Sequence, residues 1–332
     1  MTAPCGIFND CPPISAAERA KVAAAIAGAD SFSEYVWSKD GQPPIISWDN
    51  AFDRLIEKRT ALLSDLMKKG YCPYPWAILA ALPARRRLSD FFYWNQGSLP
   101  SCSMHAASHA AQGAVLTDML LGAPLVYDAL NPIYPFYRAR GGNFYGGLSI
   151  YETAEYVNQT GYNAVSEVGA DNTHAPRDAD RHLDESAKRQ AAVVYLEDDW
   201  TDRIFRAAAA GFHIVFGSYT IYTSSRNDGN GVKVGHKTTR GGHAQSFGSW
   251  RRTAGEEYVF ITNSHGEIYS RTDEGDPPNG CWLTRGQVEE VAGSFDVFGP
   301  PFIVLPENPD QTAPSLITDF APAFPRGFRK EV

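Results

Sequence analysis

The strongest constraint on the fold of this chain is the order of its hydrophobic patterns, with helix-type spacing first and strand-type runs later. Apolar side chains recur at the helical spacing up to about residue 210, and strand-like apolar runs bounded by turn residues follow. The predicted helices cover residues 16–27, 48–69, 101–121, 149–160 and 203–210. The predicted strands cover residues 213–219, 244–247 and 258–262, with a strong turn signal at 227–231. Helices first and strands later within one region indicate an α+β fold.

Composition and charge exclude several classes of protein. The 332 residues include 30 Lys and Arg against 38 Asp and Glu, which gives a net charge of −8, and 43% of the residues are hydrophobic. This composition is typical of a folded globular chain and not of a disordered one. No apolar run approaches the roughly 20 residues of a membrane-spanning helix, so no membrane partner is expected. The negative charge argues against a nucleic-acid partner, because phosphate binding needs an excess of Lys and Arg.

Cysteine usage and the N-terminus indicate a reducing, cytoplasmic setting. The chain has five cysteines, an odd number without a C-x-x-C pair, so neither a disulfide framework nor a thiolate zinc knuckle is predicted. Residues 1–14 show neither the basic nor the apolar region of a secretory signal. A single cysteine with a chemical role is therefore the hypothesis of interest.

Cys102 is the best candidate for that role. It lies at the start of the helix predicted over 101–121, where backbone N–H groups and the helix dipole lower the pKa of a thiol. A nucleophilic thiol needs a base and a group that orients the base. His243 follows Gly241 and Gly242 at the start of a predicted strand, and Asn263 ends the next strand along the chain. Two adjacent strands would bring these side chains together.

The chain order Gln96, Cys102, His243, Asn263 resembles the papain-like cysteine peptidases. The family's sequence around its nucleophile is similar to residues 96–103, and its double glycine is similar to Gly146–Gly147. The Asn-Ser-x-Gly motif at 263–266 and the resemblance of residues 82–84 to the family's mature N-terminal strand complete the match, which spans residues 82–306.

The resemblance implies a two-lobed fold, with a helical left lobe and an antiparallel β-rich right lobe, and a role for each motif residue. Cys102 would be the nucleophile, His243 the general base and Asn263 the residue that orients the imidazole. The side-chain amide of Gln96 and the backbone N–H of Cys102 would form the oxyanion hole. Gly146, Gly147 and Gly242 would bind a polypeptide substrate, and no cofactor is expected.

Three positions depart from the family pattern. The family's disulfide cysteine before the nucleophile is Leu99 here, which fits a reducing compartment. The aromatic residue after the nucleophile is Ser103, and the tryptophan after Asn-Ser is His265. An imidazole covers the Asn–His hydrogen bond less well than an indole, so we expect the pH dependence of the pair to differ.

The sequence leaves two functions open. The first is a thiol hydrolase that cleaves peptide or isopeptide bonds. The second is a papain-fold structural or interaction subunit of a larger assembly, such as a virus or phage particle, with weak, regulated or lost activity. Residues 1–81, a helical extension, and residues 307–332, an extended tail, flank the peptidase-like domain at 82–306 and would dock a protein assembly partner. The extension is interpreted as a permanent layer rather than an inhibitory pro-segment.

Three other motifs have simpler structural interpretations. Cys102, His105 and His109 share one helical face and have the spacing of metal ligands, but on a buried central helix we expect the histidines to pack. Residues 138–142 and 197–199 are interpreted as a surface loop and a solvated turn, not as an anion site and a cation site.

Overall fold

A long buried helix, α6 (Cys102–Leu120), organises the chain. The computed structural model describes residues 45–48, 50–69, 71–80, 94–121, 127–171, 174, 178–187, 189–196, 199–266, 276–277, 279–293 and 301–306. The helix predicted over 16–27, the segment 82–84 and the tail 307–332 lie outside these residues. Alanines dominate the buried surface of α6, so helices and strands approach it closely from several sides.

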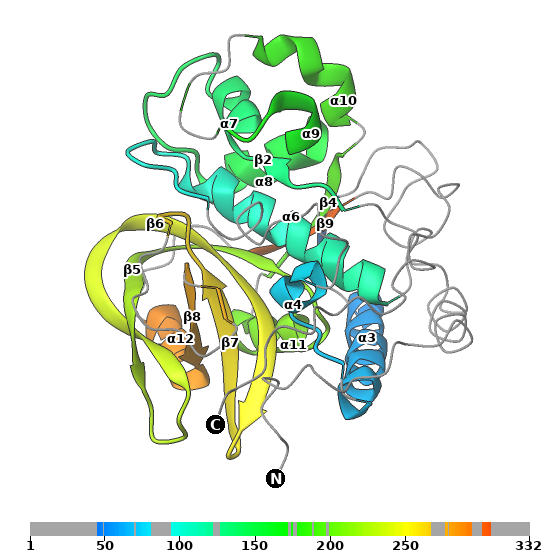
Figure 1. The fold of residues 1–332 in the computed structure, drawn as a ribbon, viewed down its shortest axis with the longest axis vertical. Helices are drawn as coiled ribbons and strands as arrows, with labels where there is room; N and C mark the ends of the chain where they lie inside the picture. The colour runs from blue at the N-terminus through cyan, green and yellow to red at the C-terminus, as the bar shows by residue number, and fades with distance from the viewer. Residues whose placement is uncertain are drawn as a thin grey trace.

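A helical lobe lies on one side of α6 (Figure 1). It contains α7 (Ile133–Ala139), α8 (Ile150–Gln159), α9 (Val165–Val168), α10 (Leu183–Ala187) and the 3-10 turn Ala179–His182. A two-stranded ladder of β2 (Leu130–Asn131) and β3 (Asn163–Ala164) joins them. The start of α8 is well specified locally, because Ser149 and Glu152 form a reciprocal capping box there.

A sheet that packs against the other side of α6 forms the second lobe (Figure 1). In the described part its strands follow the order β1-β4-β9-β5-β6-β7-β8. Their bounds are β1 (Ile45–Ser47), β4 (Ala191–Tyr195), β5 (Ile214–Asn227), β6 (Lys233–Thr253), β7 (Glu256–Thr262), β8 (Gly280–Thr284) and β9 (Phe302–Pro306). The helices α11 (Trp200–Ala209) and α12 (Arg285–Gly293) pack on it. The α+β class predicted from the sequence is confirmed.

The predicted turn at 227–231 joins β5 to β6. Asp228 caps it, since its Oδ1 accepts backbone N–H groups from Asn230 and Val232 at 2.8 Å each. The two strands it connects are much longer than predicted, because cross-strand pairing continues through polar residues that carry no apolar signal.

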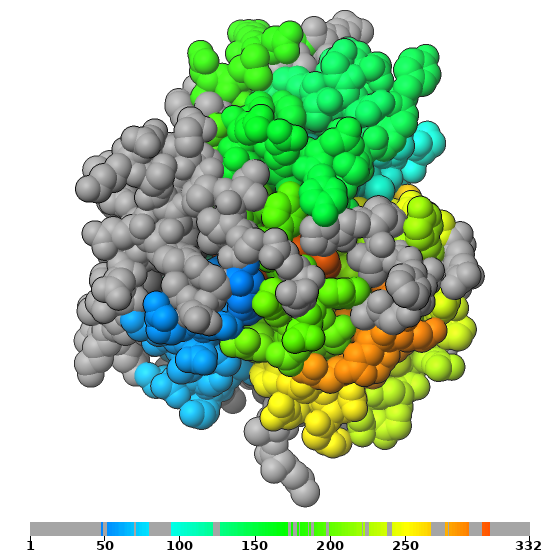
Figure 2. All heavy atoms as spheres, turned by 180° about the vertical axis from the view of Figure 1, so that it is seen from behind, coloured from blue at the N-terminus to red at the C-terminus, as the bar shows by residue number. Residues whose placement is uncertain are grey.

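The described N-terminal elements are built into the second lobe. β1 pairs in parallel with β4, and α4 (Pro75–Ala80) packs on α6. α3 (Asn50–Lys68) packs on α11, and Figure 2 shows the two side by side on the rear face. Phe52 and Ile56 of α3 belong to the same core cluster as Ile204 of α11 and Ile214 of β5. None of the described helices has the length and hydropathy needed to cross a membrane.

Candidate active site

Cys102 is the first residue of α6, and its side chain is half-buried. Its sulfur faces three backbone N–H groups, those of Ala244, Ser103 and Cys102 itself. Burial nevertheless raises the pKa of the Cys102 thiol, and the three N–H groups offset only part of that rise. The sequence predicted a lowered pKa from the helix terminus alone, and this prediction was wrong because burial outweighs the backbone dipoles.

His243 lies within β6, opposite Ser218 of β5, and only 5% of it is exposed. The pairing of the two strands shifts just before it, between the Ser218–His243 and Thr220–Arg240 pairs. This irregularity places Gly241 and Gly242 in a bulge, and a bulge redirects the side chain that follows it. The next residue, Ala244, is the one whose N–H faces the Cys102 sulfur. His243 and Cys102 are thereby brought to the same place from opposite lobes.

Asn263 follows the end of β7 and fixes the tautomer of His243. The Asn263 Oδ1 accepts the backbone N–H of Ser264 at 2.7 Å, which identifies that atom as the oxygen because a backbone N–H can only donate. The same oxygen lies 2.8 Å from His243 Nε2, so Nε2 carries the proton and donates it. In the neutral imidazole, Nδ1 is then the unprotonated nitrogen that can accept a proton.

Gln96 lies in the segment before α6 and is buried. Its Nε2 donates to the carbonyl oxygen of Leu99 at 2.6 Å, and its Oε1 accepts the hydroxyl of Ser264. Its backbone N–H donates to the carbonyl oxygen of Ser264 at 2.8 Å. The Gln96 amide is therefore held in one orientation, with one N–H of Nε2 used and the other remaining.

His265 covers His243 with a stacked ring. The ring centroids are 4.9 Å apart and the planes are inclined by 16°. Burial lowers the pKa of His243 to about 4, the hydrogen bond that its Nε2 donates to Asn263 raises the pKa, and the charge of His265 lowers it further. Burial also lowers the pKa of His265.

His105 lies deeper on the same side of α6. Its Nδ1 faces the carbonyl oxygen of Ser101 at 3.0 Å and therefore donates to it. Burial is the main reason that its pKa falls to about 4, with smaller contributions from His265 and His243. Among the described residues no group of three or more His, Cys, Asp or Glu side chains has the arrangement of a metal site.

The predicted substrate-binding glycines flank Cys102 and His243. Gly146 has a φ of +73°, and a Cβ added to Gly147 would lie 3.3 Å from the carbonyl oxygen of Pro100, in the segment that leads to Cys102. The Arg140 guanidinium holds their loop by donating twice to the carbonyl oxygen of Tyr145. Gly242 is exposed beside His243. The structure thus brings the double glycine against the Cys102 segment.

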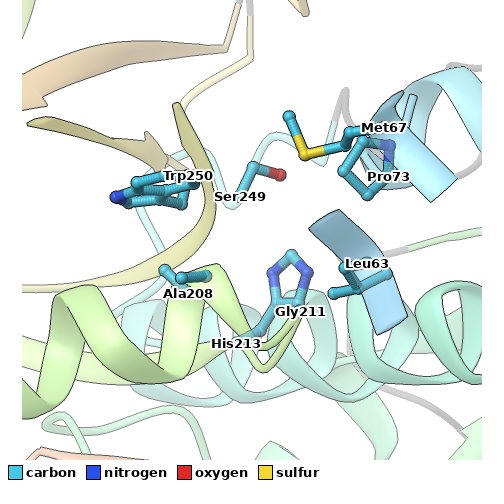
Figure 3. A pocket seen from close by; sticks show the side chains of 9 residues that line it. Leu63, Met67, Pro73, Ala208, Gly211, His213, Ser249 and Trp250 are labelled. Atoms are coloured by element: carbon cyan, nitrogen blue, oxygen red, sulfur yellow. The ribbon is translucent and has the colours of Figure 1, made fainter. Parts of the chain in front are cut away.

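A small cavity lies elsewhere, between α3, α11 and β6 (Figure 3). Its volume of about 10 Å³ has room for one water molecule. His213 borders it, and its ring fits there only because positions 113 and 248 are glycines: a Cβ at either would clash with the ring. The cavity does not include Cys102 and has no place in the chemistry of the site.

The sequence did not reveal three parts of the site. The Ala244 N–H and the Ser264 hydroxyl act through contacts that only folding creates, although Ser264 belongs to the recognised Asn-Ser motif. Asn279 contacts Asn263 from the position directly before β8, a strand without a predicted counterpart. No spacing rule indicates that residue.

The structure has two lobes, with a thiol on the central helix and an imidazole–amide pair on the facing sheet. This is the two-lobed α+β fold that the resemblance implied. Solved structures similar to this chain are cysteine proteases. Xylellain from Xylella fastidiosa is 14% identical, with 68% of this chain and 84% of that chain covered and a TM-score of 0.46. The clostridial cysteine protease Cwp84 is 13% identical over 66% of this chain and 56% of that chain, with a TM-score of 0.43. The bromelain protease of Ananas comosus, in complex with the E64 inhibitor, is 14% identical over 64% and 93%, with a TM-score of 0.44. No protein-family model and no curated protein matches the sequence.

Proposed function

We propose that the protein is a papain-like cysteine protease that hydrolyses peptide or isopeptide bonds with Cys102, His243, Asn263 and Gln96. One observation carries the proposal. The Ser264 N–H, Asn263 Oδ1 and His243 Nε2 form a chain of hydrogen bonds that leaves His243 Nδ1 as the basic nitrogen, next to the residue whose N–H faces the Cys102 sulfur. In this proposal residues 82–306 form the peptidase domain, with 1–81 as an N-terminal extension and 307–332 as a tail.

Acylation follows from this arrangement. The Cys102 sulfur attacks the carbonyl carbon of the scissile bond while the thiol proton passes to His243 Nδ1. The resulting imidazolium then gives that proton to the leaving nitrogen as the C–N bond breaks. The products of this step are a free amine and a thioester on Cys102.

The oxyanion of the tetrahedral intermediate needs N–H donors. The backbone N–H of Cys102 is one, and the second N–H of the Gln96 Nε2 is the other, since Leu99 and Ser264 fix the orientation of that amide. A donor preorganised in this way is worth roughly 3 kcal/mol in the transition state.

Deacylation uses the same base. His243 Nδ1 takes a proton from a water molecule, the hydroxide attacks the thioester carbon, and the C–S bond breaks. The sulfur leaves as a thiolate and recovers the proton from the imidazolium, which restores the starting state.

Burial shifts the pKa values of Cys102 and His243 in directions that favour proton transfer between the two residues. It raises the pKa of Cys102 and lowers that of His243, so an isolated charge of either sign is disfavoured at rest. A thiolate and an imidazolium formed together carry no net charge. Proton transfer within the pair therefore costs less than either ionisation alone.

Labelling with a thiol-directed epoxide tests the proposal. We expect one adduct by intact-protein mass spectrometry near neutral pH, located on Cys102 and lost in Cys102→Ala. Cys281→Ala is the matched control, because Cys281 is a buried thiol of β8 and its removal should leave the adduct in place. The absence of an adduct, or its persistence in Cys102→Ala, would refute the proposed function.

A further inference from the structure

Asn279 lies directly before β8 and is fully buried beside Asn263. The backbone N–H of Asn263 donates to the carbonyl oxygen of Asn279 at 2.8 Å. In return, the Asn279 side-chain Nδ2 donates to the carbonyl oxygen of Asn263 at 3.1 Å. Asn279 therefore holds both the N–H and the C=O of Asn263.

These two bonds extend the sheet by one residue at the point where the ladder stops. The β7–β8 pairing ends at Thr262 and Gly280. An antiparallel pair normally exchanges two backbone bonds. At the next position the side-chain amide of Asn279 supplies the second donor, so Asn263 is held like a strand residue although it lies beyond β7.

The residue after Asn279, Gly280, packs closely against β7. A Cβ at Gly280 would overlap the ring of Phe260 and the carbonyl oxygen of Ile261, so β8 approaches β7 more closely there than a side chain allows. The close contact at Gly280 limits the movement of Asn279, the residue before it.

The fixed position of Asn263 matters because its Oδ1 accepts two N–H groups, from Ser264 and from His243. A shift of the Asn263 backbone would turn its Oδ1 away from the imidazole. We infer that Asn279 is a positioning residue, which holds the Asn263 backbone so that the Asn263 side chain keeps His243 oriented toward Cys102. This inference deepens the proposed function and rests on it for its role in catalysis.

The readout is the titration of His243 itself, followed by NMR of its imidazole carbons and assigned by loss of the signal in His243→Gln. Among the described residues, the titratable groups near His243 are His105 from α6, His265 from the segment after β7, and Cys102, whose sulfur faces the N–H of the adjacent Ala244. All of them are unchanged in an Asn279 variant. Because the hydrogen bond that His243 donates to Asn263 raises the pKa of His243, misplacing Asn263 should lower that pKa.

We expect Asn279→Ala to lower the pKa of His243 by roughly half a unit, and to lower kcat about tenfold with KM little changed. Asn279→Leu, which keeps about the size of the side chain, lacks the donating amide and adds no titratable group, should give the same shifts if alanine prevents folding. Combining Asn279→Ala with Asn263→Ala should lower the pKa no further than Asn263→Ala alone, because both substitutions act through one hydrogen bond.

Asn158→Ala is the matched control. Its Nδ2 also makes a buried bond to a backbone carbonyl, that of Ala191 at 3.0 Å, but on α8 and away from His243. It should lower stability and leave the titration unchanged. The inference is overturned if a folded Asn279 variant titrates like the wild type, or if Asn158→Ala shifts the pKa equally. The titration needs no turnover, so a wild type without a Cys102 adduct would refute the proposed function while the role of Asn279 would still be measured.

Discussion

At the scale of single residues, the neighbours of His243 determine how readily its imidazole takes up a proton. Asn263 and His265 act on the ring in opposite directions, the first through a hydrogen bond that favours the protonated form and the second through a stacked, titratable neighbour. The family that the sequence resembles has tryptophan at position 265. The histidine found here keeps a flat cover over the ring and adds a group that repels a second positive charge.

Replacing His265 by phenylalanine tests this account. His265→Phe keeps an aromatic cover and removes the titratable neighbour, so the pKa of His243 should rise above its value of about 4. The same imidazole NMR titration measures it. His236→Gln, at an exposed position of β6, should leave the value as in the wild type. A pKa of His243 that stays constant or falls in His265→Phe would contradict the assigned effect.

At the scale of elements, contacts of α3 connect the N-terminal part of the chain to α6 and to the segment between α11 and β5. The Arg59 guanidinium pairs with Asp118 of α6 at 2.6 Å and donates to the carbonyl oxygen of Ala210 at 3.0 Å. It also lies 4.2 Å from the centre of the Phe212 ring. These contacts support the proposal that the described residues of the extension form a permanent layer of the fold.

Arg59→Ala should lower the free energy of unfolding by about 3 kcal/mol, because it leaves a partly buried carboxylate without its partner. The Arg59 side chain is only 8% exposed, which separates it from a surface ion pair. The control is Lys68→Ala, whose pair with Asp65 is 76% exposed on the lysine side and should contribute little. Urea unfolding measures both. If α3 were inhibitory, Arg59→Ala would also speed epoxide labelling of Cys102, and we expect the labelling rate to stay the same.

At the scale of the whole molecule, several neutral histidines are buried in the core. Burial lowers the pKa of His213 to about 3 and the pKa values of His105 and His243 to about 4. The unfolded chain binds protons at these residues near pH 6.5, whereas the folded chain binds them only near pH 3 to 4. The stability that their neutral forms support is therefore present above pH 6.5 and is lost as the pH falls through that window.

The free energy of unfolding should consequently fall between pH 6.5 and 4, with a slope of up to about 1.4 kcal/mol per pH unit for each such histidine. His213→Gln should flatten that slope even where it lowers stability at pH 7, because one proton-linked group is gone. Asn158→Ala, which removes no titratable group, should keep the wild-type slope. Urea unfolding at half-unit pH intervals separates the two variants, and equal slopes in wild type and His213→Gln would contradict the role of His213.

The sequence by itself determined the elements whose signal is local. The helical period over 48–69 and the alanine-rich run after Ser101 predicted α3 and α6 to within about two residues. In each helix the buried residues recur at regular spacing along the chain, so the signal is local. It also gave the order of the chemical groups, from Gln96 to Asn263. These features need no knowledge of distant contacts.

Only the tertiary structure decided the rest. The strands β1, β4, β8 and β9 are short, and β4 and β9 pair over a separation of more than a hundred residues, so no local pattern specified them. The balance between burial and backbone dipoles at Cys102, the tautomer of His243 and the hold of Asn279 on Asn263 depend on groups that meet only after folding. Sequence spacing places a residue on an element, but the desolvation and hydrogen bonding that give it a chemical role arise from the neighbours that other elements bring to it.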